Sequence, residues 1–184
     1  ALHDLGDRGA TPGEPGPVIA IDLFAGAGGF TSAANMAGVE VAFAANHSRH
    51  AVDVHTANHP GVIHECQDLR QFNFNKLDPF DILLASPSCQ GHSKAGRQGR
   101  KKSKVAEKHD LLRSTAWAVI DCLEACRPRL AIIENVVEFR DWECMPAWEM
   151  ALELMGYRVT SQVLTASLWG VGQRRRRIFY VAHL

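Results

Sequence analysis

The sequence contains no apolar run long enough to cross a bilayer, since a membrane-spanning helix needs about 20 consecutive apolar residues. Its first residues include no apolar signal core, so nothing in them points to secretion. Cysteine is sparse and odd in number, with five residues at no paired spacing. We therefore expect reduced thiols and an intracellular location, in the cytosol or nucleus. The formal net charge is zero, so the molecule as a whole is not a polycation.

What remains is the composition of an ordinary globular protein, and 184 residues suffice for one domain with a substantial core. Residues 1–17 combine Gly, Pro and charged residues without periodicity, and we expect a flexible tail there. A single domain should occupy residues 18–184. No internal repeat is evident, and the charge of the domain is segregated into clusters.

Apolar runs and helical periodicity alternate along this domain. Strands are expected at residues 18–24, 39–45, 62–64, 81–85, 130–133, 157–164 and 178–182. Helices are expected at residues 31–37, 49–58, 110–126 and 145–155. This alternation predicts the α/β class, with a mostly parallel sheet covered by helices on both faces.

The first expected strand runs into a glycine loop at residues 25–30, AGAGGF, and then into a helix. This layout is typical of a nucleotide or cofactor site, because glycines let a ligand approach the backbone and a helix N-terminus offers free N–H groups. The loop lacks the Lys-Ser/Thr of a phosphate loop, which disfavours a nucleotide triphosphatase. Gly26, Gly28 and Gly29 form G-x-G-G rather than G-x-G-x-x-G, which disfavours a dinucleotide-dependent dehydrogenase.

A thiol follows the strand expected at residues 81–85. This strand stops at Ser86-Pro87-Ser88, so Cys89 falls just past its carboxyl end, where open α/β sheets bind their ligands. We interpret Cys89 as a nucleophile, and the alternative is a cysteine that merely occupies a turn. The ends of the other strands carry further candidates, which we expect at the same sheet edge: Asp22, Phe24, Asn46, Asp68 and Glu134.

Two basic clusters accompany this edge. Cations crowd the loop after Cys89: Lys94, Arg97, Arg100, Lys101, Lys102, Lys104 and Lys108. We interpret this loop as a grip on a phosphate backbone, and the alternative is a solvated surface or a localisation signal. In the second cluster, residues 173–177, Arg175 and Arg177 alternate and can point together into the site. The alternative there is an edge strand protected by charge.

Histidines and paired cysteines are weaker candidates. The histidines between residues 47 and 64 lack the spacing of metal ligands, so no metal site is expected: His47, His50, His55, His59 and His64. Cys122 and Cys126 lie four residues apart on an expected helix, where we expect small buried apolar side chains.

Taken together, these segments resemble the C5-cytosine DNA methyltransferases. The matching pieces occur in the family's order: DLFAGAGGF at 22–30, the aspartate Asp68, PSCQGHS at 87–93, ENV at 134–136 and QRRRR at 173–177. The resemblance implies a Rossmann-like methyltransferase fold with a C-terminal antiparallel strand pair. It also implies methyl transfer from S-adenosylmethionine to carbon 5 of a cytosine flipped out of DNA.

The resemblance also implies roles for individual residues. Cys89 matches the nucleophile, Glu134 the acid that holds the cytosine ring, and Arg175 and Arg177 the pair that steadies the base. S-adenosylmethionine would contact Asp22, Phe24, Gly26, Gly28, Gly29, Asn46 and Asp68, with Phe24 against the adenine, Asn46 at the ribose hydroxyls and Asp68 at the adenine amine. DNA would contact Gln90, Ser93, Lys94, Arg97, Arg100, Lys101 and Lys102.

Four positions depart from the family pattern. Ser88 and Gly172 stand where proline is usual, and His92 where a Phe or similar residue is usual. Asn46 replaces an acid that would accept from both ribose hydroxyls, whereas Asn accepts through one oxygen only. Loss of the proline at Ser88 frees φ, which predicts a slacker nucleophile loop.

The family normally continues into a target-recognition domain and a C-terminal helix, and these 184 residues hold neither. The resemblance therefore implies either a catalytic subunit that needs a second protein chain or a fragment. Two other functions stay open. Ser88 and Asn46 favour a non-catalytic, DNA-binding or regulatory relative, while methylation of RNA cytosine would use the same mechanism.

Overall fold

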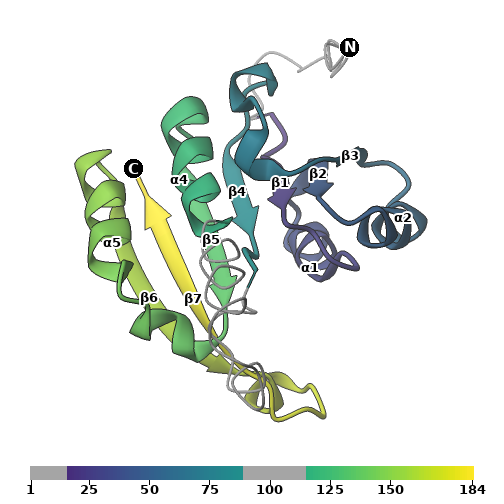
Figure 1. Cartoon of the computed structure of the whole chain (residues 1–184). Helices are drawn as coiled ribbons and strands as arrows, with labels where there is room; N and C mark the ends of the chain where they lie inside the picture. The colour runs from purple at the N-terminus through teal and green to yellow at the C-terminus, as the bar shows by residue number, and fades with distance from the viewer. Residues whose placement is uncertain (1–15, 89–114) are drawn as a thin grey trace, which may run out of the picture.

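A seven-stranded sheet forms the centre of the protein in the computed structural model, which describes residues 16–88 and 115–184 (Figure 1). The strand order is β3-β2-β1-β4-β5-β7-β6. The first five strands run parallel, and β7 is antiparallel to both β5 and β6. The strands are β1 (Ile19–Leu23), β2 (Glu40–Asn46), β3 (Ile63–Cys66), β4 (Ile82–Ala85), β5 (Leu130–Asn135), β6 (Arg158–Thr165) and β7 (Arg176–His183). The mostly parallel α/β sheet with a C-terminal antiparallel pair is therefore confirmed.

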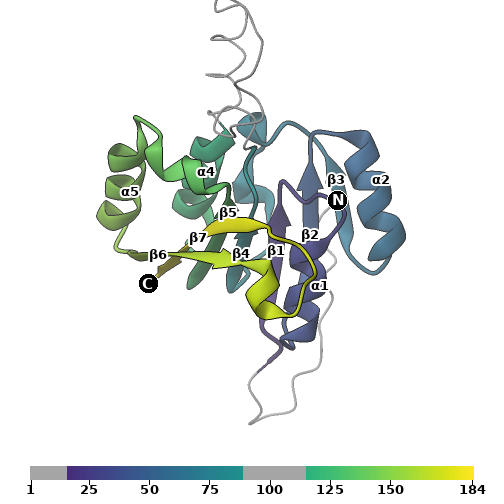
Figure 2. The ribbon, with the colours of Figure 1, turned by 90° about the horizontal axis from the view of Figure 1, so that it is seen from below.

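Helices cover both faces of this sheet. Helices α4 and α5 lie on one face and α1 on the other, while α2 flanks the β3 edge (Figure 2). These helices are α1 (Gly29–Met36), α2 (Arg49–Asn58), α4 (Thr115–Cys126) and α5 (Met145–Leu154). Within the described ranges, no helix is both long and apolar enough to pass through a bilayer. The helix expected at 110–126 is described only from Thr115 onward, and the expected tail only at Gly16 and Pro17.

The burial of each strand follows its sequence pattern. In β1 and β4 nearly every side chain is buried, as expected for apolar strands covered on both faces. In β7 the buried residues Ile178, Tyr180 and Ala182 alternate with more exposed neighbours. The two edge strands are β3 and β6, and β7 lies inside the sheet. The charge-protected edge is therefore the wrong explanation for the arginines at the start of β7.

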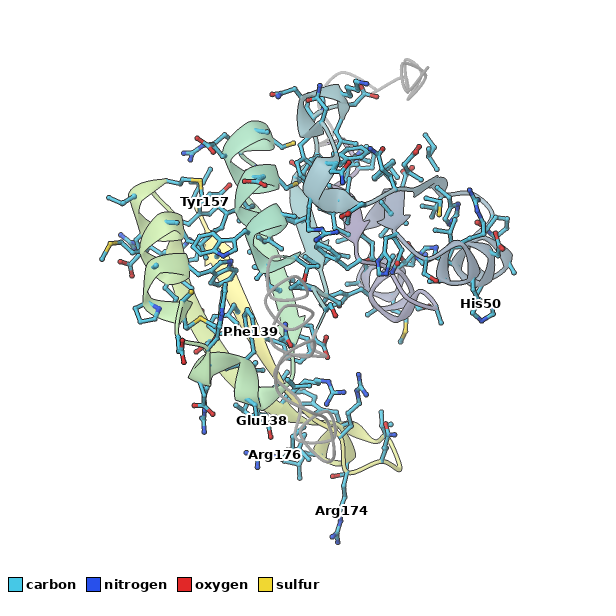
Figure 3. All side chains as sticks on the ribbon, in the orientation of Figure 1. His50, Glu138, Phe139, Tyr157, Arg174 and Arg176 are labelled. Carbon is cyan, nitrogen blue, oxygen red and sulfur yellow. The ribbon has the colours of Figure 1, made fainter. Side chains whose placement is uncertain are left out.

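An aromatic layer fills the space between α4, α5 and the sheet, where Phe139 and Tyr157 lie (Figure 3). The Trp148 indole N–H donates to the Ala116 carbonyl at 2.9 Å, and the Tyr157 hydroxyl donates to the Pro128 carbonyl at 2.8 Å. Phe139 packs edge-on against Tyr180 of β7, with ring centroids 6.0 Å apart. This layer fixes β5 and β7 relative to the helices.

The strand ends align along one edge of the sheet. Leu23 at the end of β1 is paired with Ala45 of β2 and with Ala85 of β4, and Ala85 is paired with Ile133 of β5. The residues that follow these positions therefore emerge side by side, as the sequence predicts for a parallel sheet. Glu134 belongs to this row and is paired with Phe179 of the antiparallel strand β7.

Candidate cofactor and catalytic site

A cavity of about 690 Å³ opens at this edge of the sheet. Its walls come from the end of β1, the glycine loop, the start of α1, the end of β5 and the connection from β6 to β7. It brings together seven of the residues singled out in the sequence: Asp22, Phe24, Gly26, Gly29, Glu134, Arg175 and Arg177. Residues more than 150 positions apart in the chain thus line one cavity, which we call the cleft.

The cleft has an apolar rim next to its charged residues. Phe30 of α1 meets Phe179 of β7 edge-on, with ring centroids 6.2 Å apart, and both line the cleft. The β6–β7 connection adds Trp169 and Val171, which are 71% and 53% exposed. Such a mixture of apolar walls and a few polar groups is typical of a small-molecule site.

Side chains from β2 and α2 hold the glycine loop through its carbonyl groups. The Asn46 amide donates to the Ala25 carbonyl at 2.9 Å, and the Asn58 amide donates to the Ala27 carbonyl at 2.7 Å. The His59 Nε2 lies 3.1 Å from the Gly28 carbonyl. The loop therefore has a fixed shape before any ligand binds.

Two backbone conformations in this loop are unusual. Phe24, directly after β1, has a φ of 60°, which few non-glycine residues adopt and which often marks a functional site. Gly28 has a φ of 99°, and a Cβ at this position would lie 2.4 Å from the His59 ring. Only glycine satisfies both conditions at Gly28.

Asn46 and Asp68 are engaged elsewhere, and neither is among the described residues that line the cleft. The Asn46 side chain donates to Ala25 and accepts from the Ser48 N–H at 2.9 Å. Asp68 accepts from the Arg70 backbone N–H and forms an ion pair with the Arg70 guanidinium. The hydrogen bond from the Arg70 side chain lowers the pKa of Asp68. Their expected contacts with the ribose and the adenine stay predictions.

Two arginines hold Glu134 inside the cleft. The Arg177 Nε donates to Glu134 Oε1 at 2.8 Å, and an Arg175 terminal nitrogen lies 3.7 Å from the same oxygen. The expectation that Arg175 and Arg177 point together into the site is therefore confirmed. Both contacts involve Oε1, so among the described residues the second oxygen, Oε2, is the one left for a ligand. Arg174, in contrast, points away from the protein (Figure 3).

The segment that leads to Cys89 is pinned at two successive residues. The buried Asn135 amide donates to the Pro87 carbonyl at 3.2 Å, while its oxygen accepts from the Val136 N–H at 2.9 Å. The Ser88 N–H donates to the Thr115 hydroxyl at 3.1 Å. A proline at position 88 would lack this N–H. Ser88 therefore adds a hydrogen bond that the usual proline could not form, although its φ is less restricted than that of a proline.

Several predicted residues lie outside the described ranges. They are the nucleophile Cys89 and the expected DNA contacts Gln90, Ser93, Lys94, Arg97, Arg100, Lys101 and Lys102. Sequence reasoning missed Asn135, Asn58 and Thr31 as supporting residues of the site. Asn135 had a usable signal, since a polar amide next to a buried strand end needs hydrogen-bond partners. Asn58 and Thr31 had none, because a polar residue within an expected helix is ordinarily solvent-exposed and no local pattern indicates its partner.

Comparison with known proteins decides the family. The model of the C-5 cytosine-specific DNA methylases matches residues 18–184, which is nearly the whole chain. The chain belongs to this family. The Type II methyltransferase M1.HphI of Haemophilus parahaemolyticus is 30% identical over 173 residues, covering 88% of this chain and 44% of that protein. M.HgiDI of Herpetosiphon aurantiacus is 32% identical over 167 residues, covering 89% of this chain and 51% of that protein.

Solved structures share the fold. The Dnmt2 methyltransferase of S. pombe superposes with a TM-score of 0.72 at 20% identity, over 92% of this chain and 50% of that one. The methyltransferase EhMeth of Entamoeba histolytica gives a TM-score of 0.71 at 17% identity, over 92% of this chain and 54% of that one. The chain thus spans about half the length of the curated relatives and the structures that it matches.

Proposed function

We propose that this chain is the catalytic part of an enzyme that methylates carbon 5 of cytosine in DNA, with S-adenosylmethionine as methyl donor. The observation that carries the proposal is the cleft, in which the glycine loop lies opposite Glu134 and its two arginines. A cofactor site and a charged group suited to a base thus share one cavity. The match over residues 18–184 supports the same reaction.

The cleft fits S-adenosylmethionine on grounds of its own. Gly26 and Gly29 leave open space where a Cβ would stand, so a ligand can lie close to the backbone. Asp22 is buried, and its Oδ1 has no hydrogen-bond partner within the described ranges. A buried carboxylate oxygen without a partner is costly, and a donor on the ligand would satisfy it. Bound there, the cofactor supplies an electrophilic methyl group.

The protein residues activate the cytosine. The Cys89 thiolate adds to carbon 6 of the flipped-out base, which breaks the aromatic ring system and makes carbon 5 a nucleophile. Glu134, oriented through Oε1 by Arg177, donates a proton carried on Oε2 to ring nitrogen 3 and so limits the negative charge that builds up during addition. Once carbon 5 has taken up the methyl group, its hydrogen leaves as a proton to a base, the bond between carbon 6 and sulfur breaks, and the thiolate and the aromatic ring are restored. Asn135 and Thr115 hold the backbone that leads to Cys89.

We further propose that target recognition comes from polypeptide beyond these 184 residues, either in the same chain or in a partner protein. Two observations support this proposal. The chain spans about half the length of its relatives. Trp169, which lines the cleft, and its neighbour Leu168 expose large apolar surfaces of the kind that interfaces cover.

Covalent trapping tests the reaction. The chain, alone and together with the product of any neighbouring reading frame, is incubated with S-adenosylmethionine and duplex DNA that contains 5-fluorocytosine. Fluorine at carbon 5 blocks the final elimination, so we expect a denaturation-resistant adduct that peptide mass spectrometry locates at Cys89. Omission of the cofactor and the variant Cys89→Ala are the controls, and both should yield no adduct.

The alternatives give different results. DNA binding without an adduct, in every combination of chains, would instead support a regulatory relative. An adduct with 5-fluorocytosine in RNA but not in DNA would show that the substrate is RNA rather than DNA. An adduct in Cys89→Ala would contradict the assignment of the nucleophile.

A further inference from the structure

Three histidines gather behind the glycine loop, although their spacing in the sequence shows no pattern. They are His55 of α2, His59 directly after α2 and His64 of β3. The ring centroids of His55 and His59 lie 5.0 Å apart, and those of His55 and His64 lie 4.9 Å apart. His55 is 1% exposed, which is unusual for a titratable side chain. A buried imidazole must have hydrogen-bond partners, and these connect it to the cleft.

A continuous chain of hydrogen bonds runs from His64 to Asp22. His64 Nε2 lies 2.8 Å from His55 Nδ1, and His55 Nε2 lies 3.1 Å from the Thr31 hydroxyl. The Thr31 hydroxyl donates to Asp22 Oδ2 at 2.9 Å. Four side chains from β1, α1, α2 and β3 thus form one network, which ends at a residue of the cleft.

The direction of each hydrogen bond follows from the number of protons available. Thr31 has a single hydroxyl proton, which goes to Asp22, so the hydroxyl oxygen accepts from His55 Nε2–H. If the His55 ring carries this proton alone, its Nδ1 has a lone pair, which accepts from His64 Nε2–H. Burial, together with the neighbouring His55, lowers the pKa of His64, in agreement with an uncharged His64 near neutral pH.

This network orients the Asp22 carboxylate. Oδ2 faces Thr31, and His55 Nε2 lies 3.8 Å from it. Oδ1 is buried and, in the described part of the chain, makes no hydrogen bond. Because Oδ2 is engaged, Oδ1 is the oxygen that remains for a donor group on a ligand in the cleft.

We propose that His55 is a positioning residue for cofactor binding, acting through Thr31 on Asp22. His55 donates to Thr31, which frees the Thr31 proton for Oδ2 and leaves Oδ1 to accept a hydrogen bond from a donor on the cofactor. His64 fixes the tautomer of His55. This proposal rests on the proposed cofactor site, and it assigns a role to residues that make no contact with the reacting base.

The tautomer of His55 in the wild-type chain is the first test. Nitrogen-15 NMR of the labelled imidazole rings at pH 8 should show His55 protonated at Nε2 and unprotonated at Nδ1. Saturation with S-adenosylhomocysteine should shift the His55 resonances, while those of His183, at the far end of β7, stay in place. A His55 protonated at Nδ1, or unmoved by the ligand, would overturn the proposal.

Matched variants are the second test, with the dissociation constant of S-adenosylhomocysteine measured by calorimetry. Thr31→Val keeps the shape of the side chain but removes the hydroxyl, and Thr31→Ser restores it. We expect Thr31→Val to weaken binding at least about tenfold and Thr31→Ser by less than about threefold, since a hydrogen bond to a charged group is lost only in the first. His55→Leu and His55→Gln form the same kind of pair, because glutamine can place a donor near the position of Nε2.

Thermal unfolding of each variant separates an altered site from an altered fold. Equal affinity of folded Thr31→Val and the wild type would contradict the proposal, as would failure of both Ser and Gln to restore binding. If Thr31→Val does not fold, the tautomer of His55 in the wild-type chain, measured by NMR, still tests the proposal. A wild type that binds no S-adenosylhomocysteine would refute the cofactor site itself, whereas the trapping experiment reports on the reaction at Cys89.

Discussion

At the scale of single residues, Glu134, the proposed acid, shows how the fold orients a carboxylate in the cleft. Its oxygen Oε1 meets Arg177 at 2.8 Å and Arg175 at 3.7 Å, and its side chain is 19% exposed. An arginine Nε–H on one oxygen fixes the plane of a carboxylate, because charge-assisted hydrogen bonds are short and directional. The other oxygen then has a defined position relative to any base in the cleft.

Removal of this orienting contact should slow the reaction. We expect Arg177→Ala to reduce the rate of DNA methylation at least about 100-fold, the range typical of a misplaced acid–base group. Arg158→Ala is the matched control, because Arg158 is an exposed arginine at the start of β6, and the cleft lies at the other end of this strand. The methylation rate of this variant should stay within about threefold of the wild-type rate. Tritium transfer from labelled S-adenosylmethionine to DNA measures both rates. Equal rates for the two variants would refute the role of Arg177.

Asn135 contributes at the same scale, through its hydrogen bond to the Pro87 carbonyl in the segment that leads to Cys89. Asn135→Asp keeps an acceptor for the Val136 N–H but places a carboxylate oxygen opposite the Pro87 carbonyl. We expect the variant to be destabilised by about 1–3 kcal/mol, the usual result of an unsatisfied buried polar group, and to form the trapped adduct more slowly. Chemical unfolding and adduct kinetics measure the two effects. The exposed Asn35→Ala should change neither.

At the scale of elements, the unit formed by β2 and α2 supports the glycine loop. Asn46 holds Ala25, Asn58 holds Ala27, and His59 contacts the Gly28 carbonyl. Side chains from β2, α2 and the residue after α2, which lie beyond α1 in the sequence, therefore fix the shape of this loop. A carboxylate at position 46 would have no N–H to donate to the Ala25 carbonyl. The asparagine that replaces the usual acid therefore supports the glycine loop with a hydrogen bond that the acid could not form.

The glycine loop should tolerate no side chain at Gly28. We expect Gly28→Ala to lower the free energy of unfolding by about 2 kcal/mol or more, since the φ of 99° and the contact at 2.4 Å with His59 both oppose a Cβ. Gly61→Ala is the control, because its Cβ would have nothing within 4 Å. Denaturant titration compares the variants. Adding His59→Ala should recover the part of the loss that comes from the contact.

At the scale of the whole molecule, the two tyrosines report on the aromatic layer between the helices and the sheet. Burial raises the pKa of Tyr157, and it raises the pKa of Tyr180 to about 12. Tyrosine normally ionises near pH 10. The chain contains no other tyrosine, so its phenolate absorbance reports on these two alone.

We therefore expect the folded chain to show little phenolate absorbance near 295 nm at pH 10, where an unfolded chain is half ionised. Because the pKa values of the two tyrosines are higher in the folded than in the unfolded chain, they contribute to stability. This contribution is fully present below pH 10 and is lost as the pH rises from 10 towards 12. A spectrophotometric titration with a parallel unfolding measurement checks both statements. Half-ionisation of both groups at pH 10 in the folded chain would contradict the close packing of this layer.

The sequence by itself determined the strands, the helices and the identity of the catalytic candidates. Apolar runs and helical periodicity report burial directly, so most predicted elements agree with the structure to within one or two residues. The alternation of Arg175 and Arg177 likewise predicts that they share one face, because side chains in an extended segment repeat every second residue. The ordered motifs were sufficient to indicate the family.

Only the tertiary structure decided which side chains meet. Asn46 turns to the glycine loop, and His55 reaches Thr31 and, through it, Asp22. Pro87 and Asn135 are 48 residues apart, and their contact exists because β4 and β5 are neighbours in the sheet. A periodic pattern encodes the face on which a residue lies, whereas its hydrogen-bond partner depends on strand order and register, which no local pattern contains.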